Sequence, residues 1–145
     1  LAFDETHIVC FNKYNGVNES KHISDIDSLG YKRTVEDLAL YRSFYKDKPV
    51  IMAEYGCTSI KNIRGDVFFS EDFHAEYIKR IWEAISGNPD ISGGILWSWA
   101  DYYHRKHFIN YAVYGPYGVV TIDRQPKKPL EALAEMYGGS YGITK

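Results

Sequence analysis

The chain has 145 residues, of which 45% are hydrophobic and 25% are charged, a composition typical of one globular domain or a piece of one. Its formal net charge is −2 and it has no long basic run, which argues against a protein that binds nucleic acid. No apolar stretch reaches the length of a membrane span, so we expect no membrane partner either.

The first predicted unit is a strand followed by a helix. The apolar run at 7–11 predicts a short strand, and a polar loop continues from it to about Arg33. Thr34 is a favourable N-cap residue, and apolar side chains recur at helical spacing after it. Asp-Lys-Pro at 47–49 predicts the end of this helix, because the residue before a proline disfavours helical geometry.

The second predicted unit repeats this order. The run at 50–53 predicts a strand that leads into Glu54, and Ser70 is placed to cap the next helix. Gly-Asn-Pro at 87–89 predicts where that helix ends. The stripe of this helix that we expect in the core consists of Phe73, Tyr77, Ile78, Ile81, Trp82 and Ile85.

The third predicted unit begins with a strand over 93–99. A long loop rich in His, Tyr and Gly follows it. Pro129 suits the first turn of a last helix, and the glycines at 138–139 predict its end. The order of elements is therefore strand and helix, three times over.

Three such units with nearly continuous apolar strands predict an α/β fold with a parallel sheet. Two architectures fit this pattern, a small doubly wound sheet and three-eighths of a (β/α)8 barrel. A complete barrel needs roughly 250 residues, so this chain cannot close one alone. A Gly-rich phosphate loop follows none of the strands, which argues against the nucleotide-binding form of the open sheet.

Polar and aromatic residues follow the carboxyl ends of the predicted strands. In both architectures the active site lies at these ends. Glu54 ends a buried strand, where a carboxylate is costly unless it is used or paired. It is therefore either functional or part of a structural ion pair. The strand-end residues are Asn12, Lys13, Tyr14, Glu54, Tyr55, Trp97, Ser98, Trp99 and Asp101, and they suggest no metal cluster.

Four segments, in order along the chain, resemble glycoside hydrolase family 2, which includes β-glucuronidases and β-galactosidases. Phe-Asn-Lys-Tyr-Asn-Gly at 11–16 is similar to the sixth strand of the family's TIM barrel. Pro-Val-Ile-Met-Ala-Glu-Tyr-Gly at 49–56 is similar to the seventh strand, which carries the nucleophile. The runs at 94–101 and 118–127 resemble the eighth strand and the approach to the last helix. The resemblance implies strands 6 to 8 of the barrel with their helices.

The resemblance also implies a role for each strand-end residue. Glu54 would be the catalytic nucleophile, which forms a covalent glycosyl-enzyme, and Tyr14 would donate a hydrogen bond to it. The residues implied to bind the sugar are Asn12 beside the nucleophile, Trp97 as a floor or wall, and Asp101 and Tyr102 at the rim. No cofactor and no metal is expected.

A retaining glycosidase needs a second carboxyl group, which acts as acid and base about 5 to 5.5 Å from the first. In the family it is a Glu that follows an Asn on the fourth strand, and no strand end of this chain carries that pair. The Asn18–Glu19 pair lies in a polar loop. We therefore expect residues 1–145 to be the C-terminal fragment of a TIM-barrel catalytic domain, with the remainder of the barrel as a partner and little or no activity alone. The start at Leu1, without an initiator Met, agrees with this expectation.

One departure from the family pattern concerns the substrate. Glucuronidases of this family carry Asn-x-Lys, which grips the sugar carboxylate, just before the position of Gly118. Here Gly-Pro-Tyr occupies 115–117. This difference favours a neutral β-hexoside, with a β-galactoside first. A β-glucuronidase-like enzyme with altered carboxylate recognition remains an alternative.

Two other classes of protein fit parts of this pattern. A non-catalytic carbohydrate-binding or scaffold fragment could keep the aromatic residues, but an intact Glu54 at a strand end argues against it. An unrelated α/β hydrolase would need a GxSxG motif, which is absent. Cys10 and Cys57 lie in apolar segments and are predicted to be buried free thiols. The HxxH spacing at 104–107 is interpreted as a solvated rim rather than as a metal site.

Overall fold

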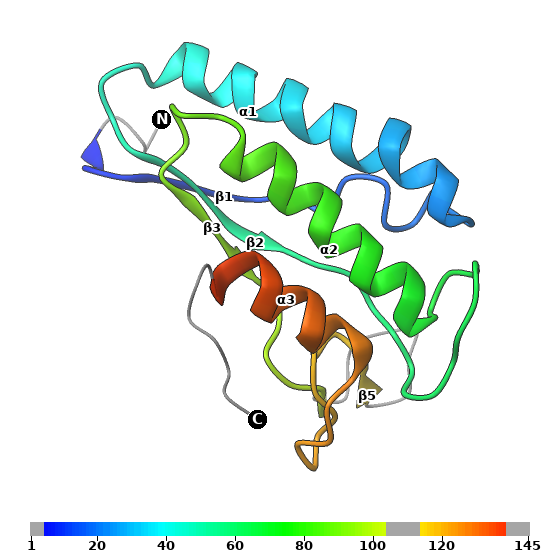
Figure 1. Cartoon of the computed structure of the whole chain (residues 1–145). Coiled ribbons are helices and arrows are strands. Elements are labelled where there is room, and N and C mark those ends of the chain that lie inside the picture. Colours follow the sequence, from blue (N-terminus) through cyan, green and yellow to red (C-terminus); the bar gives the residue numbers. More distant parts are fainter. Residues whose placement is uncertain (1–4, 104–113, 139–145) are drawn as a thin grey trace.

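The computed structural model describes residues 5–103 and 114–138. Three parallel strands form its main sheet in the order β1 (Val9–Asn12), β2 (Val50–Tyr55) and β3 (Gly93–Leu96) (Figure 1). β1 pairs with β2 from Val9 opposite Val50, and β2 pairs with β3 from Ile51 opposite Gly93. The predicted parallel sheet is therefore confirmed.

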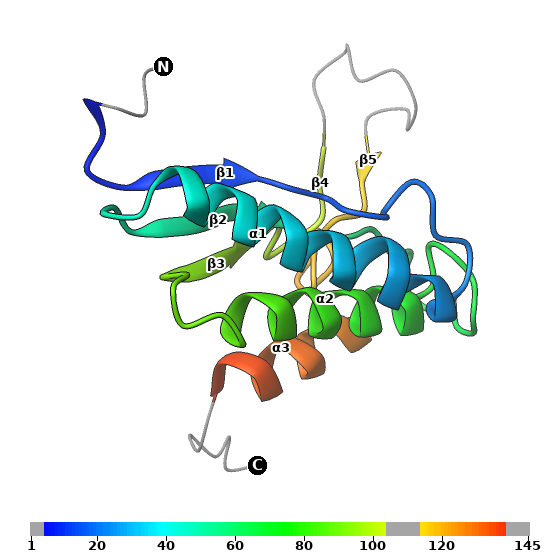
Figure 2. The same cartoon turned by 90° about the horizontal axis from the view of Figure 1, so that it is seen from above.

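Three helices lie on the same face of this sheet (Figures 1 and 2). They are α1 (Arg33–Phe44), α2 (Glu71–Ser86) and α3 (Lys128–Gly138), and α2 lies between the other two. The stripe predicted for α2 faces the core, where Phe73, Tyr77 and Ile81 are at most 1% exposed. They pack in one apolar cluster with side chains of the strands, such as Met52.

The opposite face of the sheet carries no helix among the described residues. Val9 and Phe11 of β1 are buried toward the helices, whereas Cys10 between them is exposed. Ile95 of β3 is also 58% exposed. In a (β/α)8 barrel this face lines the interior. The prediction of two buried thiols is thus correct for Cys57 and wrong for Cys10, because successive residues of a strand point to opposite faces.

The segment before α1 differs from the expected loop. A 3-10 turn (η2, Ile23–Asp25) and a π-helix (η3, Ile26–Lys32) lead directly into α1, so Thr34 lies inside the helix rather than at its N-cap. The Asp25 carboxylate accepts hydrogen bonds from two backbone N–H groups, of Lys21 at 2.9 Å and of His22 at 3.0 Å, and these start the helical turns earlier.

The third strand is shorter than the predicted 93–99 and ends at Leu96, and a cis peptide bond joins Trp97 to Ser98. Beyond it, β4 (Tyr102–Tyr103) and β5 (Tyr114–Gly115) form a small antiparallel pair. Figure 2 shows this pair projecting away from α2 and α3. Within the described ranges, no helix has the length and apolar character to cross a membrane.

Candidate active site

A cavity of about 380 Å³ opens where the three parallel strands end. Its walls come from the turn after β1, from β2, from the turn after β3, from β4 and from the segment after β5. The lining residues are Tyr14, Val17, Asn18, Glu54, Trp97, Tyr102 and Tyr117. Four residues predicted at the site from the sequence, Tyr14, Glu54, Trp97 and Tyr102, are thus brought together.

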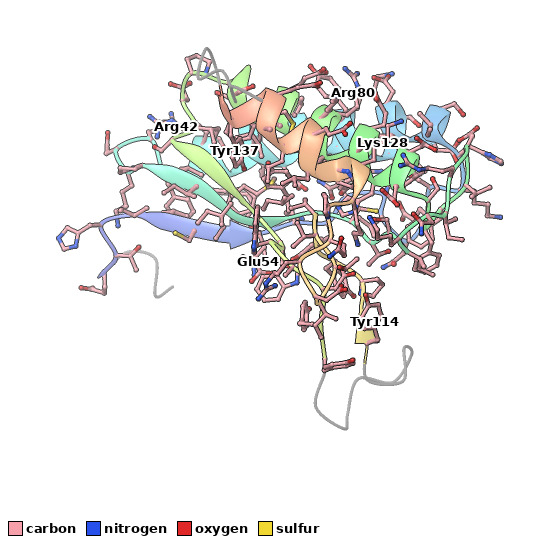
Figure 3. The ribbon with its side chains drawn as sticks, turned by 60° about the horizontal axis from the view of Figure 1, so that its bottom comes forward. Arg42, Glu54, Arg80, Tyr114, Lys128 and Tyr137 are labelled. Atoms are coloured by element: carbon pink, nitrogen blue, oxygen red, sulfur yellow. The ribbon has the colours of Figure 1, made fainter. Side chains whose placement is uncertain are left out.

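An irregularity in β2 turns Glu54 into this cavity. Val50 and Met52 are buried toward the helices, and strict alternation would direct residue 54 the same way. The pairing between β1 and β2 shifts by one residue after Met52, so that Asn12 lies opposite Glu54. Tyr55 is then buried on the helix side, and Glu54 faces the cavity (Figure 3). An inserted residue of this kind commonly redirects a side chain next to an active site.

Tyr14 holds the Glu54 carboxylate directly. Its hydroxyl donates a hydrogen bond of 2.7 Å to Glu54 Oε2. Burial, and then the hydrogen bond and the negative charge of Glu54, raise the pKa of Tyr14 far above its usual value. Tyr14 therefore remains a protonated donor at any pH near neutrality.

The turn that carries Tyr14 is anchored to the helices on both sides of it. The Asn15 side chain donates to Asp37 of α1 at 2.8 Å, and the hydroxyl of the fully buried Tyr77 donates to the Asn15 carbonyl at 2.9 Å. Gly16 has φ 77° and packs so closely against Leu29 that a side chain has no room. These contacts fix the direction from which Tyr14 approaches Glu54.

Three aromatic residues form one wall of the cavity. The Trp97 indole N–H donates to the Tyr102 hydroxyl at 3.1 Å, and their rings meet edge to face at 5.8 Å. The Tyr117 ring stacks on Tyr102 at 5.9 Å. Gly56 lets Trp97 approach, since a Cβ there would lie 2.0 Å from the Trp97 carbonyl oxygen. Flat aromatic faces with polar tips suit the apolar faces and hydroxyls of a sugar ring.

A sequence profile described as "Glycosyl hydrolases family 2, TIM barrel domain" matches residues 2–140. The chain belongs to this family. Its three βα units are accordingly a part of a (β/α)8 barrel, as predicted.

Individual relatives of the chain in family 2 are β-glucuronidases. A β-glucuronidase of Paenibacillus borealis is 28% identical over 133 residues, which are 90% of this chain and 22% of that protein. The solved structure of a β-D-glucuronidase from Dictyoglomus thermophilum is 26% identical, with a TM-score of 0.80 over 92% of this chain and 23% of that one. A β-glucuronidase of Bifidobacterium dentium, complexed with coumarin-3-O-glucuronide, is 30% identical, with a TM-score of 0.73 over 93% of this chain and 21% of that one. The chain therefore spans about a fifth of the length of these relatives.

Two of the residues expected to bind the sugar stand outside the cavity lining. Asn12 is exposed and lies beside Glu54 in the strand pairing, as expected, without lining the cavity. Asp101 is only 3% exposed, and its carboxylate accepts hydrogen bonds from Tyr114, Gly118 and Lys127. It is therefore buried behind the wall rather than at its rim, because the chain folds back over it after β5.

Three lining residues were not predicted at the site from the sequence: Val17, Asn18 and Tyr117, of which Tyr117 was noted only as the residue in place of the glucuronidases' Lys. Val17 and Asn18 directly follow the segment at 11–16 that resembles the family's sixth strand, so their place in the sequence was the available signal. Tyr117 lies 20 residues after Trp97 and belongs to the wall through its stacking on Tyr102.

Glu54 is the one ionisable carboxyl or basic group among the lining residues that the structure describes. Over residues 5–103 and 114–138, no group of three or more His, Cys, Asp or Glu side chains could hold a metal ion. The HxxH residues, His104 and His107, lie outside the described residues. The described lining thus offers one carboxylate, the Tyr14 hydroxyl that donates to it, and an aromatic wall.

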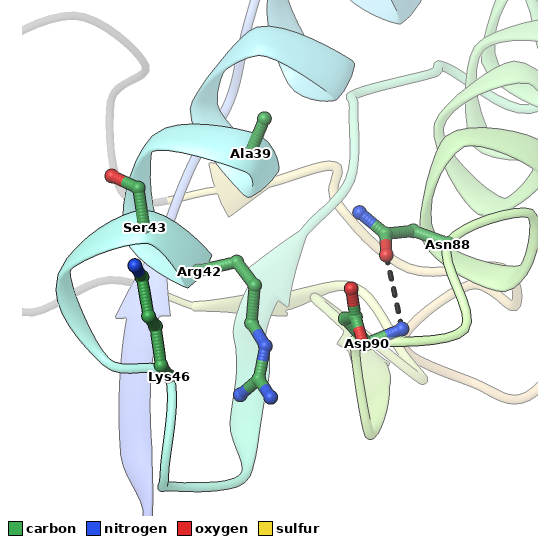
Figure 4. Close-up of a pocket in the computed structure, with 6 residues that line it drawn as sticks. All are labelled: Ala39, Arg42, Ser43, Lys46, Asn88 and Asp90. Carbon is green, nitrogen blue, oxygen red and sulfur yellow. Dashed lines mark hydrogen bonds between the residues drawn. The ribbon is translucent and has the colours of Figure 1, made fainter.

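A second hollow, of about 490 Å³, lies at the opposite end of the sheet (Figure 4). It is lined by Ala39, Arg42, Ser43, Lys46, Asn88 and Asp90. The Arg42 guanidinium already donates hydrogen bonds to the carbonyls of Tyr45 and Lys48, and these bonds cap the C-terminal end of α1. Because active sites of (β/α)8 barrels lie at the carboxyl ends of the strands, this hollow is not the candidate site.

Proposed function

We propose that this chain supplies the nucleophile and part of the sugar pocket of a retaining β-glycosidase. The observation that carries the proposal is the Glu54 carboxylate at the end of β2, held at 2.7 Å by the Tyr14 hydroxyl inside an aromatic-walled cavity. Membership of family 2 supports the same reaction class.

In the proposed reaction, the free oxygen of the Glu54 carboxylate attacks the anomeric carbon of a β-glycoside. The bond to the leaving group breaks, and the leaving oxygen takes a proton from a general acid. Water then attacks the anomeric carbon of the resulting glycosyl ester, gives its proton to the same group and releases Glu54. Two inversions leave the product in the β configuration. Tyr14 orients the carboxylate through its hydrogen bond and does not itself transfer a proton.

The general acid must come from another part of the protein. A retaining enzyme needs it about 5 to 5.5 Å from the nucleophile, and the described lining carries no second carboxyl group. We propose that it lies in the remainder of the barrel, which would cover the bare face of the sheet where Cys10 and Ile95 are exposed. Residues 1–145 would then be the C-terminal portion of the catalytic domain.

Two observations bear on the substrate. The names of the relatives favour a β-glucuronide. The described lining of the cavity instead favours a neutral β-hexoside, because it has no Lys or Arg and carries Tyr117 where the family's glucuronidases are expected to place a Lys. We propose the neutral hexoside from the geometry, with the β-glucuronide as the second candidate. None of these relatives is named a β-galactosidase, so the preference for a β-galactoside has no support from them. The β-galactoside is therefore one of several sugars in the test.

The test uses the protein that carries this chain, with the p-nitrophenyl β-glycosides of galactose, glucose, mannose and glucuronic acid. We expect the largest kcat/KM for a neutral sugar and a fall of about 10⁴-fold or more in Glu54→Gln, which lacks the nucleophile. A largest kcat/KM for the glucuronide would establish the second candidate. Binding of these sugars without turnover, or full turnover by Glu54→Gln, would reject the proposed reaction.

A further inference from the structure

A lysine and an aspartate form an ion pair behind the aromatic wall, almost completely excluded from water. Lys127 Nζ lies 2.9 Å from Asp101 Oδ1, and the two side chains are 0% and 1% exposed. Removing two charges from water is costly unless further hydrogen bonds compensate them. The other partners of the pair therefore indicate what it holds in place.

Lys127 connects three segments that are distant in the sequence. Besides Asp101, its ammonium group donates to the carbonyl of Ser59 at 2.7 Å and to that of Pro116 at 3.5 Å. Ser59 belongs to the loop after β2, Asp101 to the turn after β3, and Pro116 to the segment after β5. The lysine thus bonds to three segments at once. Two of them are the loops that follow β2 and β3, and the third is the segment after β5.

Asp101 completes this clamp on the returning chain. Its Oδ1 accepts the Gly118 N–H at 2.7 Å, and its Oδ2 accepts the Tyr114 hydroxyl at 2.6 Å. A side chain at Gly118 has no room, since its Cβ would lie 2.1 Å from the Asp101 nitrogen. The pair therefore grips the chain at Pro116 and at Gly118, the two neighbours of Tyr117.

Tyr117 is the wall residue that this grip places. It stacks on Tyr102, which in turn accepts the hydrogen bond from Trp97. We propose that Asp101 and Lys127 are positioning residues, a buried ion pair that sets the aromatic wall against the sugar without touching it. The proposal rests on the proposed function, because it assigns a role to the wall of the same site.

The test compares Asp101→Asn with wild type in the intact protein, on the best p-nitrophenyl glycoside of the panel. Asparagine keeps the size of the side chain but loses its charge. We expect KM to rise about tenfold and kcat to fall by less than about threefold, because the wall binds the ground state and the transition state alike. Asp27→Asn is the matched control, since Asp27 accepts from Arg80 on the surface of the protein, and its KM should not change.

Two further variants separate positioning from a structural role. Tyr117→Ala should raise KM to a similar extent, and the double variant with Asp101→Asn should show no additional rise if Asp101 acts through Tyr117. If Asp101→Asn does not fold, Tyr114→Phe removes one partner of Asp101 and keeps the ion pair, and a rise of about threefold in KM is expected.

The inference is overturned if a folded Asp101→Asn, or a folded Tyr114→Phe, has the KM of the wild type, or if the effects of Asp101→Asn and Tyr117→Ala multiply. Such results leave the proposed function intact as long as Glu54→Gln is inactive. Turnover by Glu54→Gln would instead reject the proposed function itself.

Discussion

At the scale of single residues, the direction of one side chain decides the chemistry. Glu54 faces the cavity because the strand pairing shifts by one residue after Met52. The sequence alone shows an acidic residue at a strand end, and the family resemblance suggests its role. The shift that turns the carboxylate into the pocket becomes visible only when β1 is paired with β2. The same limit explains Asp101, which looks like a rim residue in the sequence and is buried by a segment that returns from far along the chain.

The Tyr14 hydroxyl can be tested without changing the size of the residue. Tyr14→Phe removes the hydrogen-bond donor to Glu54, so kcat should fall about 10²-fold, as when one preorganised donor is lost from an active site. Tyr41→Phe is the control, since its ring stacks on Phe11 on the helix side of the sheet. Steady-state kinetics of both variants give the comparison, and an unchanged kcat in Tyr14→Phe would exclude the role of this hydrogen bond.

His74 should make stability depend on pH. It is fully buried and hydrogen-bonded to the Ser59 hydroxyl at 2.9 Å, and burial, with a smaller effect of the Lys127 charge, lowers the pKa of His74 to about 3. The unfolded chain, with a histidine pKa near about 6.5, binds a proton that the folded chain does not bind between these two values. The free energy of unfolding should therefore fall as the pH falls through this window, by up to about 1.4 kcal/mol per pH unit from this residue.

The comparison that isolates this effect is His74→Gln, with denaturant unfolding measured from pH 7 down to pH 4. The variant lacks the titrating group, so the difference in unfolding free energy between wild type and variant should shrink toward acid pH. Parallel curves for the two proteins would show that His74 does not titrate in this way.

At the scale of elements, the parts with strong local signals were predicted and the others were not. The strands follow from apolar runs, α2 from its Ser70 cap and its stripe, and α3 from Pro129 in its first turn. The helical turns of η2 and η3 were not predicted, because the Asp25 hydrogen bonds that start them and the burial of Ile26 and Gly30 in η3 follow from the folded structure and not from an apolar repeat in the sequence. β4 and β5 are two residues long and lie too far apart in the sequence to give a hairpin signal.

The Ser70 cap is the local signal that a stability measurement can test. The Ser70 hydroxyl oxygen accepts the Phe73 N–H at 2.9 Å, and the hydroxyl donates to the Gly65 carbonyl at 2.6 Å. Ser70→Ala should lower the free energy of unfolding by about 1 to 2 kcal/mol. Ser86→Ala, at the exposed end of the same helix, should change it by about 0.5 kcal/mol or less. Equal effects in urea denaturation would contradict the importance of the cap.

At the scale of the whole molecule, the three strands present a layer that is covered on one face. All three helices lie on that face. Cys10 of β1 and Ile95 of β3 are exposed on the face without helices. Neither β1 nor β3 has a second strand partner among the described residues. Membership of the barrel family explains both features, since neighbouring units of a closed barrel cover the edges and fill the interior.

The reactivity of the two cysteines can test whether the remainder of the barrel covers this sheet. Burial raises the pKa of the Cys57 thiol to about 12, so Cys57 should resist thiol reagents whether or not the rest of the barrel is present. Cys10 is exposed in this chain and should be protected once the remainder of the barrel covers the sheet. Maleimide labelling followed by peptide mass spectrometry, on this chain and on the protein that carries it, distinguishes the two states. Equal labelling of Cys10 in both would contradict the proposed closure, and denatured samples give the full-labelling reference.

In the proposed reaction, Glu54 becomes covalently bonded to the sugar. The most direct measurement treats the protein that carries this chain with activated 2-deoxy-2-fluoro-β-glycosides, neutral and uronic, and maps the adduct by peptide mass spectrometry. The fluorine slows hydrolysis of the glycosyl-enzyme, and the good leaving group reduces the need for the general acid. We expect one sugar attached to Glu54, with time-dependent loss of activity at the same rate. A sugar attached to a different carboxylate, or inactivation with Glu54 unmodified, would contradict it.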